Sequence, residues 1–420
     1  MIRNFILLFS IVTGPALLAQ EHPSHLPHPD IVEQAISTHP IVGAAEAHLT
    51  AAHAEARRRK AGNHDFILSG SYIRRDTQNQ STFNEWDSSI SRAVRLPGKA
   101  KADRKIGALG VEVAENARDD ARHQVALLLK DYWFDWLTAA GNVAIDKLET
   151  ATYQRELEIV RKRRHLKEAA LLDEDEVRSA LAAAQARASA NTAKQLEAKR
   201  ALKSMFPDMP LPTVAPRVST PEPSGRTHQE WRNLILQRSH ELRMVEKEAE
   251  RQTSLARRAR LDRFADPSVG VRVFSERGGE ESGVGVFLSV PFGMKHRTAA
   301  SDIRRAKAVA AASDVRQANR LIIEVADRDI TRAEAGVGIW QQAAVALEAN
   351  AAVIKRLHRA VEMGDRDIND LLRALRQHYA VKRSEVAARV AAQDALAQLQ
   401  IDAHEIWILA HDDAHEAESR

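Results

Sequence analysis

Two parts of the chain carry the period-two alternation of apolar residues that is typical of a β-strand. The alternation is clear in one series of side chains, Val284, Val286, Leu288 and Val290, and weaker in a second, Phe66, Leu68 and Tyr72. We therefore expect two pairs of strands, at about 64–96 and about 267–291. Within the first pair, the polar stretch 76–84 is expected to connect strands at 65–75 and 86–96.

The placement of proline shows where long helices can run. No proline lies between Pro97 and Pro207, and none follows Pro291. Because proline inside a helix breaks it, both windows allow very long helices. A helix from Pro97 to about Leu172 would measure roughly 110 Å at 1.5 Å per residue. A heptad series in the second window indicates helices packed as in a coiled coil, Trp340, Leu347, Ile354 and Val361.

The same succession of elements occurs twice, which indicates a duplication. Each copy reads as a helix, two strands, a long helix, a turn and a shorter helix, and we expect the helix before the strands and the helix after the turn to stack along the long one. Pro97 and Pro291 are 194 residues apart, and Glu168 and Glu362 of the turns have the same spacing. This spacing predicts equal lengths from proline to turn, and it places Ala170 opposite Gly364. The two turns are therefore not expected to bind a partner identically.

The predicted fold class is mainly α with a small β part. The first residues read as a secretory signal, because Arg3 precedes an apolar run that ends near Ala19. The expected organisation is a signal peptide 1–19, a first repeat 20–206 with its turn at about 168–176, a proline-rich linker 207–227, a second repeat 228–409 with its turn at about 362–370, and a polar tail 410–420.

Composition excludes several classes of function. The chain has 61 basic and 57 acidic residues and no cysteine. The balanced charge argues against a nucleic-acid partner, and the lack of cysteine excludes disulfides, thiolate metal sites and an acylated cysteine anchor. The basic runs 57–60, 161–164 and 257–258 fall within helical patterns, so we expect solvated faces paired with nearby carboxylates.

Catalytic motifs are missing from the sequence: we find no H-E-x-x-H, phosphate-binding loop or G-x-S-x-G, and we expect neither an enzyme nor a cofactor. Imidazoles with carboxylates suit transition metals, and such residues gather near both ends of the chain, at His22, His25 and His28 and at His404, His411, Asp412, Asp413, His415 and Glu416. We interpret them as polar tails that raise the local metal concentration without forming a coordination site.

These features together resemble the TolC-like outer-membrane factors over roughly residues 31–407. The marks that carry the resemblance are His39-Pro40 at a helix start, Leu96-Pro97-Gly98 and Val290-Pro291-Phe292-Gly293 at the strand ends, and the turn Met363-Gly364-Asp365-Arg366-Asp367. A less specific likeness to the heavy-metal-efflux (Czc-type) branch lies in Asp266-Pro267, Val269-Gly270-Val271 and the run 275–279.

The resemblance implies a homotrimer in which each chain gives four transmembrane strands to one twelve-stranded β-barrel, which the helices continue as a periplasmic α-barrel. It implies a place in the outer membrane of a Gram-negative bacterium, in contact with lipid. The implied function is the passive exit duct of a tripartite efflux system, which conducts substrates such as divalent metal cations. The implied partners are a periplasmic adaptor (membrane fusion) protein and an inner-membrane pump, with the RND type favoured.

Two other functions stay open at this point. A duct for type I protein secretion shares the fold, and the sequence separates it poorly from an efflux duct. A periplasmic coiled-coil adaptor or structural protein is the third reading. An adaptor would have one hairpin between β-rich halves, whereas this chain has two hairpins.

The turns hold the candidate site residues. Carboxylates that recur around a tunnel mouth would favour cations or act as a gate, and these are Asp173, Asp175, Asp365 and Asp367, together with Arg366. Ordinary helix capping is the alternative role for the aspartates. By resemblance, the flanking residues dock the adaptor, namely Leu171, Leu172, Val177, Gly364, Ile368, Leu371 and Leu372; the alternative for the hydrophobic ones is packing between neighbouring hairpins.

Overall fold

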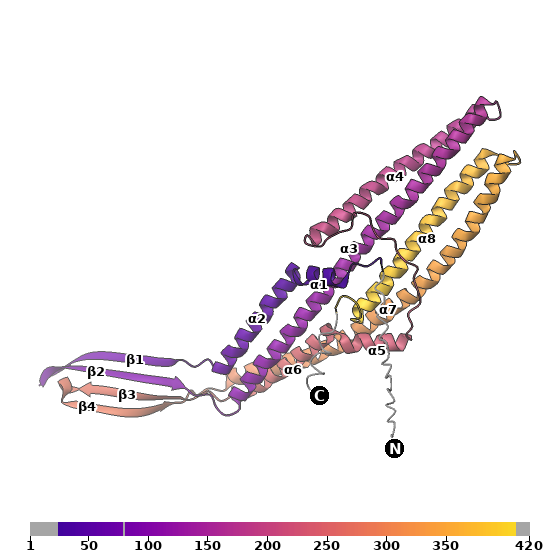
Figure 1. Ribbon diagram of the computed structural model, residues 1–420. Coiled ribbons are helices and arrows are strands. Elements are labelled where there is room, and N and C mark those ends of the chain that lie inside the picture. Colours follow the sequence, from indigo (N-terminus) through magenta and orange to yellow (C-terminus); the bar gives the residue numbers. More distant parts are fainter. Residues whose placement is uncertain (1–23, 79, 409–420) are drawn as a thin grey trace, which may run out of the picture.

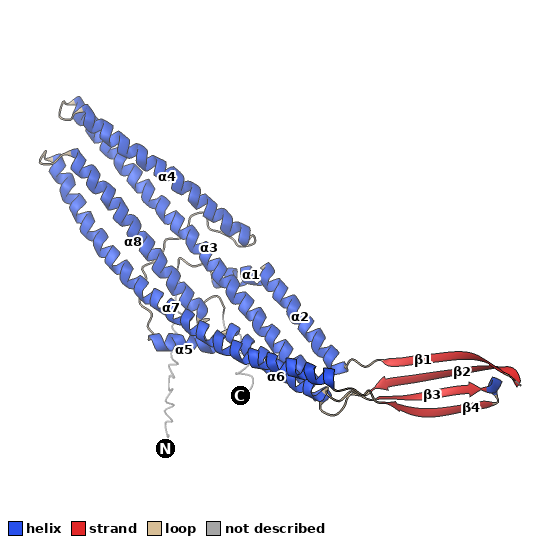
Figure 2. Cartoon of the chain, turned by 180° about the vertical axis from the view of Figure 1, so that it is seen from behind, coloured by secondary structure: helices blue, strands red, loops and turns tan. Residues whose placement is uncertain are grey.

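The computed structural model describes residues 24–78 and 80–408, and within them the chain is elongated (Figure 1). A small sheet forms one end, and two long helical hairpins reach the other end (Figure 2). In the described part of the chain, none of the helices combines the length and the apolar character needed to cross a membrane. The predicted signal segment 1–19 and the tail 410–420 lie outside the described residues.

The predicted duplication is present in the order of the elements. The first copy consists of α1 (Pro29–Ser37), α2 (Pro40–Ala61), β1 (Phe66–Thr77), β2 (Gln80–Ala93), α3 (Lys99–His165) and α4 (Leu171–Met205). The second copy consists of α5 (His228–Arg238), α6 (His240–Leu261), β3 (Ser268–Glu276), the short 3₁₀ helix η1 (Arg277–Gly279), β4 (Glu281–Ser289), α7 (Lys295–Glu362) and α8 (Ile368–Asp402). The long helices α3 and α7 have 67 and 68 residues.

Each copy opens with two helices where the pattern suggested one. In the first copy the break falls at Pro40, which lacks the N–H that would continue α1 but fits the first position of α2. The His39 ring caps α2 by accepting from the N–H of Ile41 at 3.3 Å. In the second copy Ser239 has the same role, and its hydroxyl accepts from the N–H of Leu242 at 3.1 Å.

The four strands form one antiparallel sheet in the order β1-β2-β3-β4. The predicted connector at 76–84 is wrong, because β1 continues to Thr77 and β2 begins at Gln80. The polar residues pair across the two strands, with Arg74 opposite Asn84, and the Tyr72 hydroxyl donates to the Asn84 amide oxygen at 2.8 Å. Polar side chains thus extend the ladder where the sequence pattern suggested a loop.

The helices stack as the lengths predicted. The helices α4 and α2 follow one another along α3, and α8 and α6 follow one another along α7 (Figure 1). The helix α3 also packs against α6 and α8, so it joins the two copies. On the seam between α7 and α8, the Trp340 indole N–H donates to Glu385 at 2.9 Å.

The largest apolar core lies halfway along the molecule, where the linker and both ends of the described chain meet α3. It buries large side chains from α3, the linker and the C-terminal segment, including Trp133, Trp136, Phe206, Met209 and Trp407. A second core fills the ends of the hairpins, and a third lies between α5, α7 and α8. The linker is therefore packed against the hairpins and does not act as a free tether.

Candidate functional site at the sheet and the helical tips

The register of the sheet gathers most of the large apolar side chains on one face. Because paired residues of neighbouring strands point to the same side, this apolar face consists of Phe66, Leu68, Tyr72, Trp86, Ile90, Val269, Val271, Val273, Val284, Val286 and Leu288. All of them are between 38% and 80% exposed. Within residues 24–78 and 80–408, no helix packs over this face. An exposed apolar surface of this kind marks a contact with another protein or with lipid.

The opposite face of the sheet is mainly polar, although Ile67 and Ile73 are also exposed on it, at 60% and 53%. The Ser71 hydroxyl donates to Asp87 at 2.7 Å, and the Arg272 guanidinium lies 3.2 Å from the same carboxylate. Two aromatic rings interrupt this face, Phe274 and Phe287, but each lies over a glycine of the facing strand. A Cβ at either glycine, Gly283 or Gly270, would come within 2.6 Å of the ring.

The apolar and polar faces of the sheet match the pattern expected of strands with lipid on one side and water on the other. A strand that crosses a membrane needs about 9–11 residues and alternates apolar and polar side chains. The strands here have 12, 14, 9 and 9 residues. The outer edges of β1 and β4 have no strand beside them in the described chain, and such edges pair with further strands.

At the other end of the molecule, both hairpins turn in the same way. Lys167 has φ of 63° and Gly364 has φ of 79°, the left-handed conformation that ends many helices. The following N–H donates to the carbonyl five residues earlier, at 2.8 Å for Glu168 and 2.9 Å for Asp365. The residue opposite Gly364 is therefore Lys167, and the predicted match with Ala170 is wrong.

The correction shifts the match between the turns by three residues. The ends of α3 and α7, and the starts of α4 and α8, are each 197 residues apart and not 194. The helix α3 begins two residues after Pro97, whereas α7 begins four residues after Pro291, and α7 is one residue longer than α3. The prolines mark strand ends and not helix starts, so proline spacing did not measure the helices.

Two of the predicted tip aspartates cap helices. Asp367 is the N-cap of α8, and its carboxylate accepts from the N–H of Asn369 at 3.3 Å. Asp173 accepts from the N–H of Ala170 at 2.8 Å, at the start of α4. Both contacts supply partners for N–H groups that a helix start leaves free. Both aspartates thus have the capping role. Asp367 is also exposed at the tip surface, whereas Asp173 is half-buried.

The remaining tip residues are exposed and differ in their contacts. Asp175 pairs with Arg178 in its own helix. Arg366 lies 3.7 Å from Asp370, one turn into α8. Asp365 is exposed at the turn itself.

The sequence reading missed the carboxylate that organises the first tip. Glu174 is 3% exposed and lies 3.1 Å from Arg161, 2.8 Å from Arg164 and 2.5 Å from Arg178. The hydrogen bond from Arg161 is the main cause that lowers the Glu174 pKa. The basic run 161–164 could have pointed to Glu174, because it was predicted to pair with a nearby carboxylate. Two of its arginines, Arg161 and Arg164, do so.

The predicted docking residues divide into two groups. Leu171 and Leu172 are 59% and 65% exposed at the tip surface. The other hydrophobic residues are buried in the core of the tips, Val177, Ile368, Leu371 and Leu372. For these, packing within the chain is the observed role. Two further exposed side chains, Leu166 and Met363, join the surface at the turns.

A buried ion cluster ties the hairpins together below the tips. Arg383 of α8 lies 2.6 Å from Asp146 of α3 and also pairs with Glu149, and both carboxylates are 1% exposed. From α4, Arg187 lies 2.7 Å from Glu149, and the Asn191 amide donates to Asp146 at 2.6 Å. The cluster therefore connects three helices and both copies of the repeat.

Of the described histidines predicted to lie in tails, His25 and His404 belong to the core, whereas His28 is exposed and caps α1. His25 is 1% exposed, and its carbonyl accepts from the Trp133 indole at 2.9 Å. The His404 ring lies with its centroid 5.5 Å from that of His123 and 4.8 Å from that of His240, and burial lowers the His404 pKa to about 3. Over the described ranges, no group of three or more histidines and carboxylates could hold a metal ion. The predicted tail residues His22 and 411–416 lie outside those ranges.

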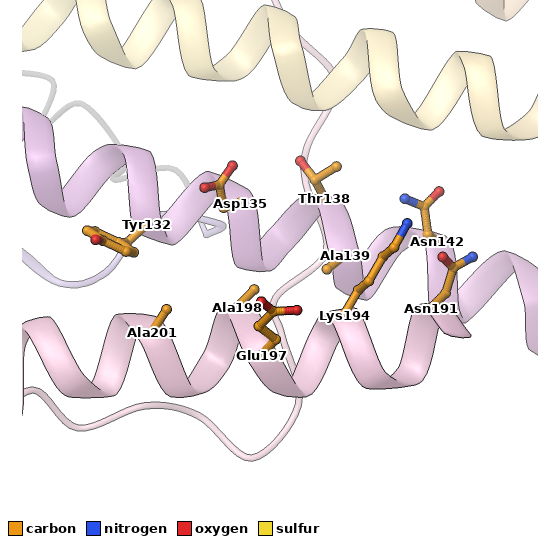
Figure 3. Close-up of a pocket in the computed structure, with 10 residues that line it drawn as sticks. All are labelled: Tyr132, Asp135, Thr138, Ala139, Asn142, Asn191, Lys194, Glu197, Ala198 and Ala201. Carbon is orange, nitrogen blue, oxygen red and sulfur yellow. The ribbon is translucent and has the colours of Figure 1, made fainter. Parts of the chain in front are cut away.

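A polar hollow of about 380 Å³ lies between α3 and α4 (Figure 3). Its lining combines Tyr132, Asp135, Thr138, Ala139, Asn142, Asn191, Lys194, Glu197, Ala198 and Ala201. The Thr138 hydroxyl donates to the Phe134 carbonyl at 2.8 Å, so it is engaged by its own helix. The hollow is a mixed polar surface between the helices of one hairpin.

No protein-family model matches the sequence, and no curated protein is similar to it in sequence. Solved structures do match. The CmeC outer membrane channel of Campylobacter jejuni has a TM-score of 0.73 at 13% identity, over 93% of this chain and 88% of that one. The outer membrane protein VceC of Vibrio cholerae has a TM-score of 0.72 at 15% identity, over 89% and 95%. CusC, described with its transmembrane channel formation, has a TM-score of 0.71 at 15% identity, over 89% and 91%. The chain therefore has the fold of the TolC-like outer-membrane channels.

Proposed function

We propose that the protein is the outer-membrane exit duct of a tripartite efflux system in a Gram-negative bacterium. Three copies would close a twelve-stranded barrel, and their hairpins would continue it through the periplasm. The observation that carries the proposal is the two-faced sheet, whose apolar face is exposed in the single chain. The likeness in fold to outer-membrane channels supports the same placement.

Closure by several copies follows from the sheet edges. A single chain gives four strands, too few for a membrane barrel, whose smallest examples have about eight. Pairing β4 of one copy with β1 of the next would satisfy both edges and continue the apolar face around the outside. The polar face, with Asp87 and Arg272, would then line a water-filled lumen.

The proposed activity is passive conduction, with energy from an inner-membrane pump of the RND type and contact through a periplasmic adaptor. The exposed leucines at the first tip, Leu171 and Leu172, are the proposed adaptor contacts. Leu171→Ser with Leu172→Ser should weaken adaptor binding and leave the trimer intact. Equal adaptor binding by this variant would exclude these residues as the contact.

Divalent metal cations are the proposed cargo, in line with the likeness to the Czc-type branch. The tip aspartates would favour cations at the tunnel mouth. Asparagine caps a helix as well as aspartate does, so Asp173→Asn and Asp367→Asn remove charge and keep the caps. In planar bilayers, these changes with Asp365→Asn should reduce selectivity for cations over anions. Unchanged selectivity would remove the aspartates from this role.

A duct for type I protein secretion remains the second candidate, because it shares this fold. A knockout strain tested against divalent metals, organic solvents and antibiotics separates the two. Sensitivity to one of these classes supports efflux. Normal tolerance together with loss of a secreted protein from the medium would favour secretion.

A further inference from the structure

The junction between the helices and the sheet carries a surplus of positive charge. Here α2 and α6 end and α3 and α7 begin (Figures 1 and 2). Eight exposed cations lie in these four helix ends, and we call them the basic collar: Arg57, Lys60, Lys101, Arg104, Lys105, Arg257, Arg260 and Lys295. The structure records no ion pair between any of them and a described carboxylate.

Other cations at the same junction are paired. Lys99 is buried and lies 2.7 Å from Asp266. Arg258 lies 2.8 Å from Asp103, and Arg58 lies 2.6 Å from Glu55. Three carboxylates of the junction, Asp103, Asp262 and Asp266, are thus already paired with other cations. The eight cations of the basic collar outnumber the exposed carboxylate that remains there, Asp65.

Helix dipoles account for only a small part of the basic collar. Cations stabilise the C-terminal end of a helix and destabilise the N-terminal end. Lys60 and Arg260 lie in the last turns of α2 and α6, where the dipole favours them, and Arg57 and Arg257 lie just before those turns. Arg104 and Lys105 lie in the second turn of α3, where the dipole has little effect. Lys101 and Lys295 lie in the first turns of α3 and α7, and neither helix has an acidic residue there. Their placement opposes the dipole and calls for another partner.

Apolar side chains fill the space between the basic collar and the apolar face. Phe292 is 96% exposed and Phe264 is 64% exposed, and both lie in the segments that join helix and strand. At the same end of the apolar face, the Arg92 guanidinium stacks on Phe66, 4.7 Å from its ring centroid. In the chain, Phe292 lies between β4 and Lys295, and Phe264 lies between Arg260 and β3, so each aromatic residue separates a strand from a cation of the basic collar.

We propose that the basic collar binds the phosphates of anionic phospholipids in the membrane leaflet that faces the helices. This inference rests on the proposed placement of the sheet in the outer membrane. Anionic headgroups attract basic segments within a Debye length of the surface, and guanidinium groups bind phosphate through two parallel hydrogen bonds. The strand turns at the opposite end carry Glu276, Glu280 and Glu281 beside Arg277, so only the helical end has this surplus.

The test uses the full trimer in vesicles of phosphatidylcholine alone and of phosphatidylcholine with an equal part of phosphatidylglycerol. After extraction in a non-ionic detergent, mass spectrometry counts the lipids that stay bound. The wild type should retain the anionic lipid about tenfold over the neutral one at low salt. The collar variant replaces Lys101, Arg104, Lys105 and Lys295 with Gln and should retain both lipids equally.

The variant is chosen so that unfolding cannot explain the loss, because removing cations from helix N-terminal ends does not weaken those helices. The matched control replaces four exposed cations elsewhere on the helices, Lys162, Lys194, Lys355 and Arg356, with Gln, and should keep the preference. No preference in the wild type, or an unchanged preference in the collar variant, would overturn the proposal. So would full competition by millimolar inorganic phosphate, which would indicate a site for free anions. Failure to insert into vesicles of phosphatidylcholine alone would overturn the membrane placement itself, and the collar with it.

Discussion

The ion cluster around Arg383 makes a quantitative prediction about how the two copies hold together. Replacing Arg383 with Met leaves Asp146 and Glu149 buried with only Arg187 and Asn191 as partners. Removing one partner of a buried ion pair costs about 3–5 kcal/mol. We expect the lower end, about 3 kcal/mol, because the contacts from α4 remain.

Hydrogen exchange measures this cost where it arises. A loss of about 3 kcal/mol should speed exchange of the α3 and α8 amides near the cluster about a hundredfold. The matched control is Arg376→Met, an exposed arginine two turns earlier in α8, which should change exchange little. Replacing Asp146 and Glu149 with Leu in the Arg383→Met background should restore most of the protection, since a well-packed apolar cluster can replace buried ions.

The reasoning would be refuted by a loss of less than about 1 kcal/mol for Arg383→Met. It would also be refuted if Arg376→Met produced an equal loss. Either result would mean that the cluster does not couple the hairpins.

The remaining predictions concern pH, the turns and the sheet. Burial lowers the His404 pKa from 6.5 to about 3, so the unfolded chain gains the proton first as the pH falls. The free energy of unfolding, measured with denaturant, should therefore be about 2 kcal/mol lower at pH 5 than above pH 6.5. His404→Phe should reduce this dependence on pH. In the same assay, Gly364→Ala should lower the free energy of unfolding by about 1 kcal/mol and Lys167→Gly should raise it by a similar amount, because both residues have positive φ. A gain from Gly364→Ala or a loss from Lys167→Gly would contradict the corrected match of the turns. Val271→Arg on the apolar face should cost about 2–4 kcal/mol of stability in vesicles, and Ser89→Arg on the polar face should cost little; a similar cost at both sites would argue against the two-faced sheet.

Much of the fold could be predicted because the elements have strong local signals. Alternation placed the strand that contains Val284 and Val286, and the lack of proline after Pro291 allowed the long α7. The connector at 76–84 could not be predicted, because polar residues on a strand that faces water look like a loop. Its pairing depends on the facing strand, which local composition does not reveal.

The tips were harder to predict for a different physical reason. A left-handed turn usually contains glycine, so Gly364 was visible and Lys167 was not. The roles of the flanking hydrophobic residues also depended on burial. Leu171 and Ile368 are aliphatic residues that each begin the second helix of a hairpin, yet Leu171 is exposed and Ile368 lies in the core.

The central claim is that the sheet separates lipid from water, with the apolar face outward. Because the chain has no native cysteine, single cysteines can report each face without background. We predict that Ser69→Cys and Ser89→Cys react with a charged maleimide in native membranes, whereas their neighbours Leu68→Cys and Ile90→Cys react only after denaturation. Equal labelling of both faces in native membranes, or labelling confined to Leu68→Cys and Ile90→Cys, would contradict the account.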